Sequence, residues 1–227
     1  MSLASTIRMV LAPPHPAGRP FIWGGAALAL VGLFLTKWLF WPALLFTLFC
    51  LYFFRDPERV TPTRHQVVVS PADGRVVLVG SAVPPPELGL GDQPLPRIAV
   101  FLSVLDVHVN RIPVAGVVTR IAYRAGLFLN AALDKASEDN ERNALVVRMT
   151  DGRDVAVVQI AGLIARRIVC TVREGDRLEA GERFGIIRFG SRTDVYLPPG
   201  TKLLALPGQI MTGGETVIAE LPALVTT

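Results

Sequence analysis

The N-terminal quarter of the chain contains one long apolar segment. Residues 21–54 form a run of 34 residues in which Lys37 is the only charged side chain. As a single helix, rising 1.5 Å per residue, this run would extend about 51 Å, whereas the hydrocarbon core of a membrane is ~30 Å thick. Two helices, at 21–36 and 38–54, fit that thickness better. The pattern therefore predicts an apolar helical hairpin broken at Thr36-Lys37, and these lengths are compatible with either a spanning or a shallow hairpin.

Basic side chains lie at both ends of this apolar segment: Arg8 and Arg19 before it, and Arg55, Arg59 and Arg64 after it. Cytoplasmic flanks of membrane helices are enriched in Lys and Arg, so a hairpin with both ends in the cytoplasm fits this distribution better than a single crossing. A cleaved signal peptide would require a small-residue cleavage site after a shorter apolar region, and the sequence lacks one. We therefore expect association with the cell membrane, a cytoplasmic N-terminal segment (1–20) and a cytoplasmic body (55–227).

The body has the sequence character of a β protein. Short runs rich in Val and Ile alternate with Gly and Pro. The candidate strands are Gln66–Val69, Arg75–Gly80, Arg97–Val104, Ala115–Tyr123, Leu145–Met149, Val155–Ile160, Arg183–Phe189 and Glu215–Leu221. Strands this short and numerous favour antiparallel pairing. The predicted fold class is mainly β (α+β), an antiparallel β body that follows the helical hairpin.

A weak internal repeat lies near the C-terminus. Gly175-Asp-x-Leu-x-x-Gly181-Glu recurs 33 residues later as Gly208-Gln-x-Met-x-x-Gly214-Glu. Paired units of this kind resemble the half-barrels of lipoyl and biotinyl carrier domains, and the sequence around Lys135 resembles a lipoyl attachment site. A membrane-tethered carrier or adaptor without catalysis is therefore an alternative hypothesis. Against it, Lys135 lies 40 residues before the first unit, whereas a carrier lysine should lie between the two units.

Charge and metal-ligand spacing exclude two further classes. The formal charge is +4, but subtracting Arg8, Arg19 and Lys37 from the 23 basic residues leaves 20 in the body against all 19 acidic ones. A near-neutral body lacks the concentrated basic face of a nucleic-acid binder. The 3 histidines are dispersed and the 2 cysteines isolated, which is not the spacing of a metal site. We expect neither a nucleic-acid partner nor a metal.

The candidate chemistry begins with His108. It ends an apolar run, and alternation along an extended segment would place it on one face with Asp106 and Asn110. The other histidines, His15 and His65, lie in polar stretches and are expected at the surface.

Two further pieces are ordinary turns when taken alone. Ser70-Pro-Ala-Asp73-Gly has the composition of a turn after a strand. Gly190-Ser191, between two strand-like runs, is a hairpin signal.

The order of the motifs carries more information than any one of them. They are Phe53-Phe-Arg55-Asp-Pro57, Ser70-Pro-Ala-Asp73-Gly, Asp106-Val-His108, Asn140-Glu-Arg142-Asn143 and Gly185-Ile-Ile-Arg-Phe-Gly190-Ser191. In this order, over about residues 50–220, the chain resembles the short form of phosphatidylserine decarboxylase proenzymes.

The resemblance implies self-cleavage at Gly190-Ser191 into a β chain (1–190) and an α chain (191–227). The Ser191 hydroxyl would attack the preceding carbonyl, the resulting ester would eliminate, and hydrolysis would leave a covalent pyruvoyl group at the new N-terminus. That group would form a Schiff base with phosphatidylserine and release CO2 and phosphatidylethanolamine, a step of phospholipid biosynthesis. No pyridoxal phosphate is then needed, because the pyruvoyl carbonyl supplies the same electron sink.

The resemblance also implies roles for particular residues. Asp73 would orient or polarise, and His108 would exchange protons. Longer family members have a second histidine where this chain has Arg111, which is no base at neutral pH. Either His108 therefore serves both cleavage and decarboxylation, or Asp73 activates Ser191 by another route. Arg142 and Arg55 also match family motifs and are candidates for binding the substrate. Arg142 would either contact the lipid phosphate or be a solvated charge in a loop. The implied assembly is a heterodimer of the α and β chains, or a dimer of these, with a phospholipid substrate.

Overall fold

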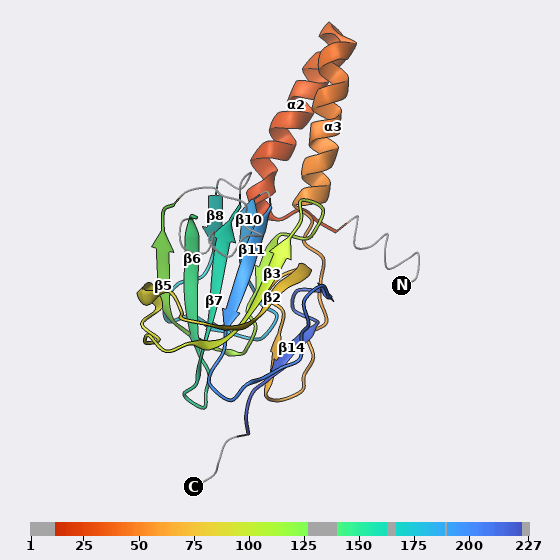
Figure 1. Ribbon diagram of the computed structural model, residues 1–227. Helices are drawn as coiled ribbons and strands as arrows, with labels where there is room; N and C mark the ends of the chain where they lie inside the picture. The colour runs from red at the N-terminus through yellow and green to blue at the C-terminus, as the bar shows by residue number, and fades with distance from the viewer. Residues whose placement is uncertain (1–11, 127–139, 163–166, 189, 224–227) are drawn as a thin grey trace. The chain divides into compact units, whose positions relative to one another are not determined.

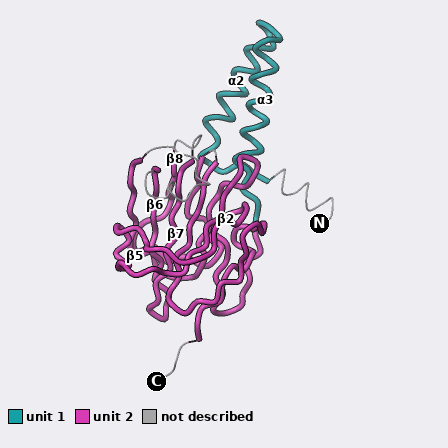
Figure 2. Tube along the Cα trace, in the orientation of Figure 1, with its two compact units in different colours: residues 1–58 teal, residues 59–227 magenta. Residues whose placement is uncertain are grey.

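The computed structural model describes residues 12–126, 140–162, 167–188 and 190–223, and the chain divides into two compact units, residues 1–58 and 59–227 (Figure 2). The first unit is a helical hairpin. A short 3₁₀ helix, η1 (Pro16–Gly18), leads into α2 (Arg19–Leu35), and α3 (Lys37–Phe53) follows. Thr36 between them is extended, and its hydroxyl accepts the Trp38 N–H at 3.3 Å as an N-cap. The predicted hairpin is confirmed, with its break at Thr36.

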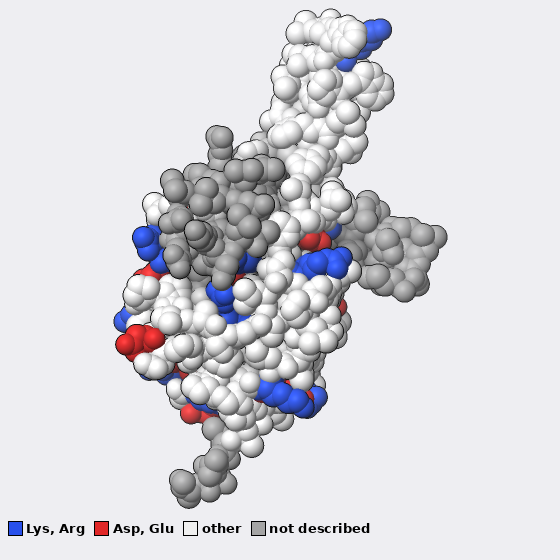
Figure 3. Space-filling view, in the orientation of Figure 1, with Lys and Arg blue, Asp and Glu red and all other residues white. Residues whose placement is uncertain are grey.

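The two helices pack closely at glycines and expose apolar side chains. A Cβ on Gly25 would lie 2.5 Å from the Thr47 hydroxyl, and one on Gly32 would lie 2.6 Å from the Phe40 nitrogen. Side chains such as Phe34 and Trp38 are about four-fifths exposed, at 80% and 81%. Along its length the hairpin surface in Figure 3 is free of charge, with blue only at its tip. An uncharged apolar surface of this kind is suited to a membrane or another apolar environment.

By length and composition, one helix among the described residues could cross a membrane. It comprises η1 and α2, Pro16–Leu35, with a mean hydropathy of 1.5. The second helix of the hairpin, α3, is apolar but shorter, at 17 residues. These lengths are weak evidence for association with a membrane.

The described residues of the second unit form three antiparallel sheets (Figure 1). The eight-stranded sheet has the order β13 (Ile210–Met211), β2 (Gly74–Ala82), β3 (Leu95–Leu102), β11 (Ser191–Tyr196), β7 (Asp154–Ala161), β6 (Arg142–Arg148), β5 (Gly116–Arg124) and β9 (Arg177–Leu178). One small sheet has the order β1 (Val67–Val69), β14 (Val217–Glu220) and β12 (Lys202–Leu203). The other small sheet has the order β4 (Val109–Arg111), β10 (Arg183–Arg188) and β8 (Arg167–Cys170). A 3₁₀ turn, η2 (Pro86–Leu88), lies between β2 and β3. The mainly β, antiparallel fold class is confirmed.

The weak repeat in the sequence belongs to a larger internal symmetry. Counted inward from its two edges, the eight-stranded sheet consists of two matching sets of four strands. One set is β13, β2, β3 and β11, and the other, in the corresponding order, is β9, β5, β6 and β7. Met211 pairs with Gly74 at the start of β2 as Leu178 pairs with Gly116 at the start of β5. Both β2 and β5 are then bulged two residues later. The two small sheets correspond in the same way, so the half-barrel features expected from the repeat extend over both halves of the unit.

One half of this symmetric unit is inserted into the other. Strands β4 to β10 form one half, and β1 to β3 with β11 to β14 form the other. The chain therefore crosses between halves twice, once after β3 and once at Gly190. The expected hairpin at Gly190-Ser191 is wrong, because β10 pairs with β4 and β8 whereas β11 pairs with β3 and β7. Gly190, at φ +68°, instead carries the chain from one sheet into another.

Alternation along β11 decides which side chains face the main core. Val195 belongs to the core cluster that includes Val100, Leu145 and Phe184. Tyr196 belongs to a smaller cluster on the opposite face, together with Leu88. Because side chains alternate along a strand, Ser191 and Thr193 face the main-core side, and Arg192 and Asp194 face the other.

Candidate active site

The site is organised around the peptide bond between Gly190 and Ser191. The Gly190 N–H donates to Nε2 of His108 at 3.3 Å, and Nδ1 of His108 lies 2.9 Å from the carbonyl oxygen of Asp106. A ring nitrogen beside a carbonyl oxygen must carry the proton, so Nε2 is the nitrogen with the lone pair. His108 is fully buried. The structure thus directs the basic nitrogen of His108 at the candidate cleavage site.

The carbonyl group of Gly190 is polarised by a backbone N–H that lies just after the end of β7. Its oxygen accepts the N–H of Gly162 at 3.1 Å. Gly162 is buried and directly follows β7, whose last residue, Ala161, pairs with Ser191. A backbone N–H aimed at a carbonyl oxygen is the element from which oxyanion holes are built. Sequence reasoning missed Gly162, because a backbone donor leaves no residue-type signal.

The hydroxyl of Ser191 is an uncommitted polar group. Ser191 is fully buried, and its Oγ has no hydrogen-bond partner among the described residues. A buried hydroxyl without a partner costs free energy and is unusual outside functional sites. Here it belongs to the residue that follows the polarised Gly190 carbonyl.

Asp73 lies on the other side of β3 from Ser191. Both Ser191 and Gly74 adjoin the end of β3, and a Cβ on Gly74 would lie 2.1 Å from the Phe101 carbonyl oxygen. Asp73 therefore lies roughly 10 Å, or two strand spacings, from Ser191. Its Oδ2 accepts from Arg59 at 2.6 Å and its Oδ1 from the Gly213 N–H at 2.8 Å.

The electrostatic environment of Asp73 holds two opposing influences. Burial raises the pKa of the Asp73 carboxyl above its ordinary value, and the nearby carboxylate of Asp106 adds to this rise. The Arg59 guanidinium and the Gly213 N–H lower the same pKa but do not cancel the effect of burial. Arg59, which no motif singled out, is thus the cation that accompanies Asp73.

The segment that carries His108 differs from the extended strand expected for it. Asp106 lies in the turn before β4, where its carboxylate accepts the Ser103 N–H at 2.7 Å, so it does not share a strand face with His108. Asn110 does lie two residues along from His108. Arg111 alternates to the opposite face, where it donates to the Gly181 carbonyl at 2.9 Å.

Both arginines expected to bind the substrate contact other groups of the protein. Arg142 is buried on β6 and donates to the Glu87 carboxylate at 2.5 Å. Its strand neighbour Ala144 lies in the cluster with Tyr196, so Arg142 faces the side of the sheet opposite Ser191. Arg55 belongs to the first unit, where it donates to the Tyr52 carbonyl at 2.8 Å and lies over the Tyr52 ring.

The other two histidines, His15 and His65, were both expected at the surface. His15 is buried, and its Nδ1 accepts the Ala17 N–H at 3.2 Å as the cap of η1, so the expected surface position is wrong for it. His65 is exposed, as expected. Among the described residues, no group of three His, Cys, Asp or Glu side chains could hold a metal. Lys135, the candidate carrier lysine, lies outside the described residues.

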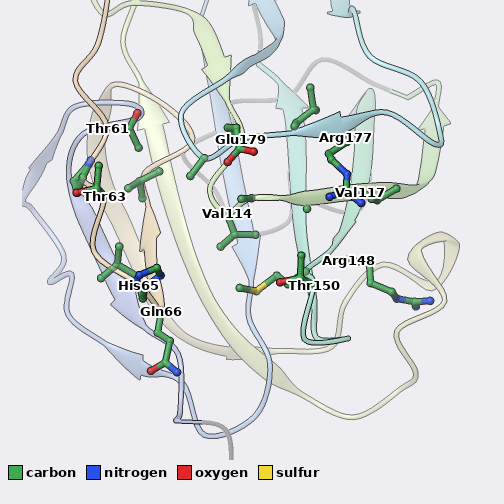
Figure 4. A pocket seen from close by; sticks show the side chains of 18 of the residues that line it. Thr61, Thr63, His65, Gln66, Val114, Val117, Arg148, Thr150, Arg177 and Glu179 are labelled. Atoms are coloured by element: carbon green, nitrogen blue, oxygen red, sulfur yellow. The ribbon is translucent and has the colours of Figure 1, made fainter.

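A pocket of about 700 Å³ includes His65 in its lining (Figure 4). Thr61, Arg148, Thr150 and Arg177 also line it. Arg148 ends β6, whereas Ser191 is level with the other end of this seven-residue strand. At 3.3 Å per residue the two places are about 20 Å apart. The pocket is therefore distinct from the candidate cleavage site.

Comparison with known proteins identifies the chain. Residues 46–219 match the family described as Phosphatidylserine decarboxylase. Three curated relatives are each named Phosphatidylserine decarboxylase proenzyme. That of Granulibacter bethesdensis is 70% identical, over 97% of this chain and 91% of its own length. That of Gluconacetobacter diazotrophicus is 61% identical, over 97% and 100%, and that of Cereibacter sphaeroides is 58% identical, over 92% and 90%.

The fold, the buried serine and these relatives define the class of protein as a decarboxylase made as a proenzyme. The chain belongs to the phosphatidylserine decarboxylase family. The resemblance drawn from the five motifs is confirmed, and the carrier or adaptor hypothesis is not favoured.

Proposed function

We propose that the chain cleaves itself at Gly190-Ser191 and then decarboxylates phosphatidylserine to phosphatidylethanolamine and CO2 with a pyruvoyl group derived from Ser191. One observation carries the proposal: a base and an oxyanion donor both contact Gly190, and the next residue carries an uncommitted hydroxyl. They are His108 Nε2, the Gly162 N–H and Ser191 Oγ. The relatives' names give the substrate class.

Cleavage begins with the Ser191 hydroxyl. Its oxygen attacks the Gly190 carbonyl carbon while His108 Nε2 takes the hydroxyl proton, and the Gly162 N–H stabilises the negative charge that develops on the carbonyl oxygen. The C–N bond then breaks, and His108 returns the proton to the departing Ser191 nitrogen. The product is an ester between the Gly190 acyl group and Ser191 Oγ.

The ester then loses the Ser191 α-proton, and the Gly190 carboxylate departs with the former Oγ. Water hydrolyses the dehydroalanine that remains, releasing ammonia and leaving the pyruvoyl group on residue 191. The buried, unpartnered Ser191 side chain fits this fate, because its conversion leaves no broken hydrogen bond. The pyruvoyl group would supply an electron sink at residue 191, where the electron pair left on the substrate carbon by the departure of CO2 could be delocalised.

The same protein groups serve the second reaction. His108, buried next to residue 191, can return a proton to the substrate carbon after CO2 has left. Asp73 and Arg59 form an ion pair beside the end of β3. Asp73 would act on the reaction by orienting nearby groups and through its electric field, rather than by direct contact with the reacting atoms. No metal enters either reaction as proposed.

The proposed assembly follows from the cleavage. A β chain (1–190) and an α chain (191–227) remain together, because the β11 strand of the α chain is paired on both sides by strands of the β chain. The apolar hairpin would hold this heterodimer, alone or as a dimer of heterodimers, at the cell membrane with the catalytic unit in the cytoplasm. A membrane location brings the enzyme to a phospholipid substrate without its extraction into water.

Intact mass and denaturing electrophoresis test the proposal. The wild type should give two chains, the smaller beginning at residue 191 and blocked to Edman degradation, and Ser191→Ala should remain one inactive chain of 24.6 kDa. A wild type that stays uncleaved and still decarboxylates phosphatidylserine would overturn it. Recovery of the whole protein in the soluble fraction without detergent would contradict the membrane location.

A further inference from the structure

A closed ring of contacts surrounds the main-core side of Ser191. On β11, Thr193 lies two residues from Ser191 on the same face. Gln159 of β7 pairs with Thr193, and its Nε2 donates to Oδ1 of Asn110 at 2.7 Å. Asn110 is two residues from His108, whose Nε2 contacts Gly190 and so closes the ring. All the side chains of this ring are buried.

Three side-chain amides, two from this ring and Asn143 beside it, form a hydrogen-bonded chain in which every bond runs the same way. Asn143 Nδ2 donates to Gln159 Oε1 at 2.9 Å, and Gln159 Nε2 donates to Asn110 Oδ1 at 2.7 Å. Each amide therefore accepts from the one before it and offers its NH₂ group to the next. The last in the chain, Asn110, consequently has its donor, not its acceptor, available on the side of the ring.

The end of this amide chain is unsatisfied. Asn110 Nδ2 is buried and has no hydrogen-bond partner among the described residues, and the same holds for Thr193 Oγ1. A buried donor without an acceptor costs about 1–3 kcal/mol, so two of them beside a reactive residue indicate a place for a ligand that accepts hydrogen bonds. The serine headgroup of the proposed substrate has two groups that accept hydrogen bonds as anions, a phosphate and a carboxylate, and of these two only the carboxylate is bonded to the carbon that reacts.

We infer that Asn110, oriented by Gln159 and Asn143, donates to the carboxylate of the phosphatidylserine headgroup and so selects a carboxylate-bearing amine. The inference rests on the proposed function of Ser191. A neutral amide suits the task, because an arginine would hold the charged carboxylate more strongly and so oppose its loss as neutral CO2. Asn110 would thus be a catalytic-site contact, and Gln159 a positioning residue that acts through it.

The test compares two lipids that differ only in this carboxylate. With mature enzyme in detergent micelles, KM and kcat are measured for phosphatidylserine, and the half-saturating concentration of phosphatidylethanolamine is measured by reductive trapping with cyanoborohydride, read as added mass on the α chain. Asn110→Asp, an isosteric change that replaces the donor by an acceptor, should raise KM for phosphatidylserine at least tenfold, since hydrogen bonds to charged groups contribute about 1.5–3 kcal/mol. The value for phosphatidylethanolamine should stay within about twofold.

Two further variants guard against misfolding. Asn110→Ala removes the donor without adding a charge and should show the same lipid-selective loss. Gln159→Glu cannot donate, so Asn110 should turn its NH₂ toward residue 159 and present its oxygen to the substrate, again raising KM for phosphatidylserine alone. Gln209→Glu, at an exposed turn, is the matched control. It should change neither the KM for phosphatidylserine nor the half-saturating concentration of phosphatidylethanolamine.

The outcomes separate this inference from the proposed function. If the variants self-cleave and the binding of both lipids weakens by the same factor, or the binding of neither weakens, the assignment of Asn110 to the carboxylate is wrong. If the wild type neither cleaves nor is trapped by phosphatidylethanolamine, the proposed function itself fails.

Discussion

The N–H of Gly162 donates to the carbonyl oxygen of Gly190 over 3.1 Å, at the place where the chain leaves the inserted half of the β unit. The donor belongs to the inserted half and follows β7, while the acceptor ends that half and precedes β11. This hydrogen bond is formed before any reaction occurs. Its donor is therefore already in place for charge to develop on that oxygen.

Gly162→Pro, which removes this N–H, should slow self-cleavage by about 10²–10³-fold, the usual effect of losing one oxyanion donor. The preceding residue, Ala161, is in an extended strand, which is the conformation favoured before a proline. Gly162→Ala keeps the N–H and is the control. Cleavage is followed by electrophoresis during refolding, and equal rates for the proline and alanine variants would exclude the oxyanion role.

His108→Gln should abolish or slow self-cleavage by about 10²–10⁴-fold, because the glutamine amide cannot take the Ser191 proton. The side chain is fully buried, so a glutamine of similar size disturbs packing less than alanine would. His65→Gln, at an exposed residue in the separate pocket, is the matched control and should cleave normally. Normal cleavage in His108→Gln would transfer the role of base to another group.

Asp73 should make stability depend on pH in a predictable direction. Its pKa is raised by burial in the folded protein, so the stabilisation from holding its proton is complete below the unfolded pKa and is lost as pH rises through the folded pKa. Asp73→Asn cannot ionise. In the uncleaved Ser191→Ala background, the Tm of Asp73→Asn relative to Asp73 should therefore increase between pH 4 and pH 7.

Loss of the Arg59 ion pair lowers the Tm of Asp73→Asn by an offset, but the slope with pH is the quantity that tests the prediction. A Tm difference that stays flat or falls as pH rises would mean that the pKa of Asp73 is not raised.

A buried ion pair follows Ser191 on the opposite face of β11. Arg192 donates twice to the Asp194 carboxylate, at 2.7 and 3.0 Å, and both residues are almost fully buried. Asp194→Asn should lower the free energy of unfolding by about 3–5 kcal/mol, because it leaves a buried guanidinium without its counter-charge. Asp154→Asn, which breaks a similar two-bond pair with the half-exposed Arg148, should cost about 0–1 kcal/mol. Urea titrations of the Ser191→Ala chain measure both, and similar costs would contradict the prediction.

Local patterns in the sequence were sufficient for most of the elements. The run broken at Thr36-Lys37 predicted two helices because a charge and an N-cap interrupt an otherwise apolar stretch. The predicted strands include most of the long ones, whose apolar residues build the core, and also the short β1 and β14. Other strands of two to four residues, such as β4, β9 and β13, carry too few residues to show a period and were not predicted. The six-residue β11 was also missed, because it begins with four polar residues.

The hairpin expected at Gly190-Ser191 failed for a different reason. A glycine between two strand-like runs is locally the same whether the strands pair with each other or with others. Only the long-range pairing of β11 with β3 and β7 makes this glycine a crossing between sheets. The same limit applies to Arg142. Its residue type suits a phosphate, but only the strand register shows that it faces the side of the sheet opposite Ser191.

The sequence by itself determined the family, the residue types of the reaction and the apolar hairpin, because these depend on which side chains occur and in what order. Tertiary structure decided which atoms meet. The direction of the His108 lone pair, the Gly162 N–H on the Gly190 carbonyl and the amide chain that ends at Asn110 join residues from different strands. Such contacts depend on strand register and backbone direction between segments distant in the chain, which no local pattern encodes.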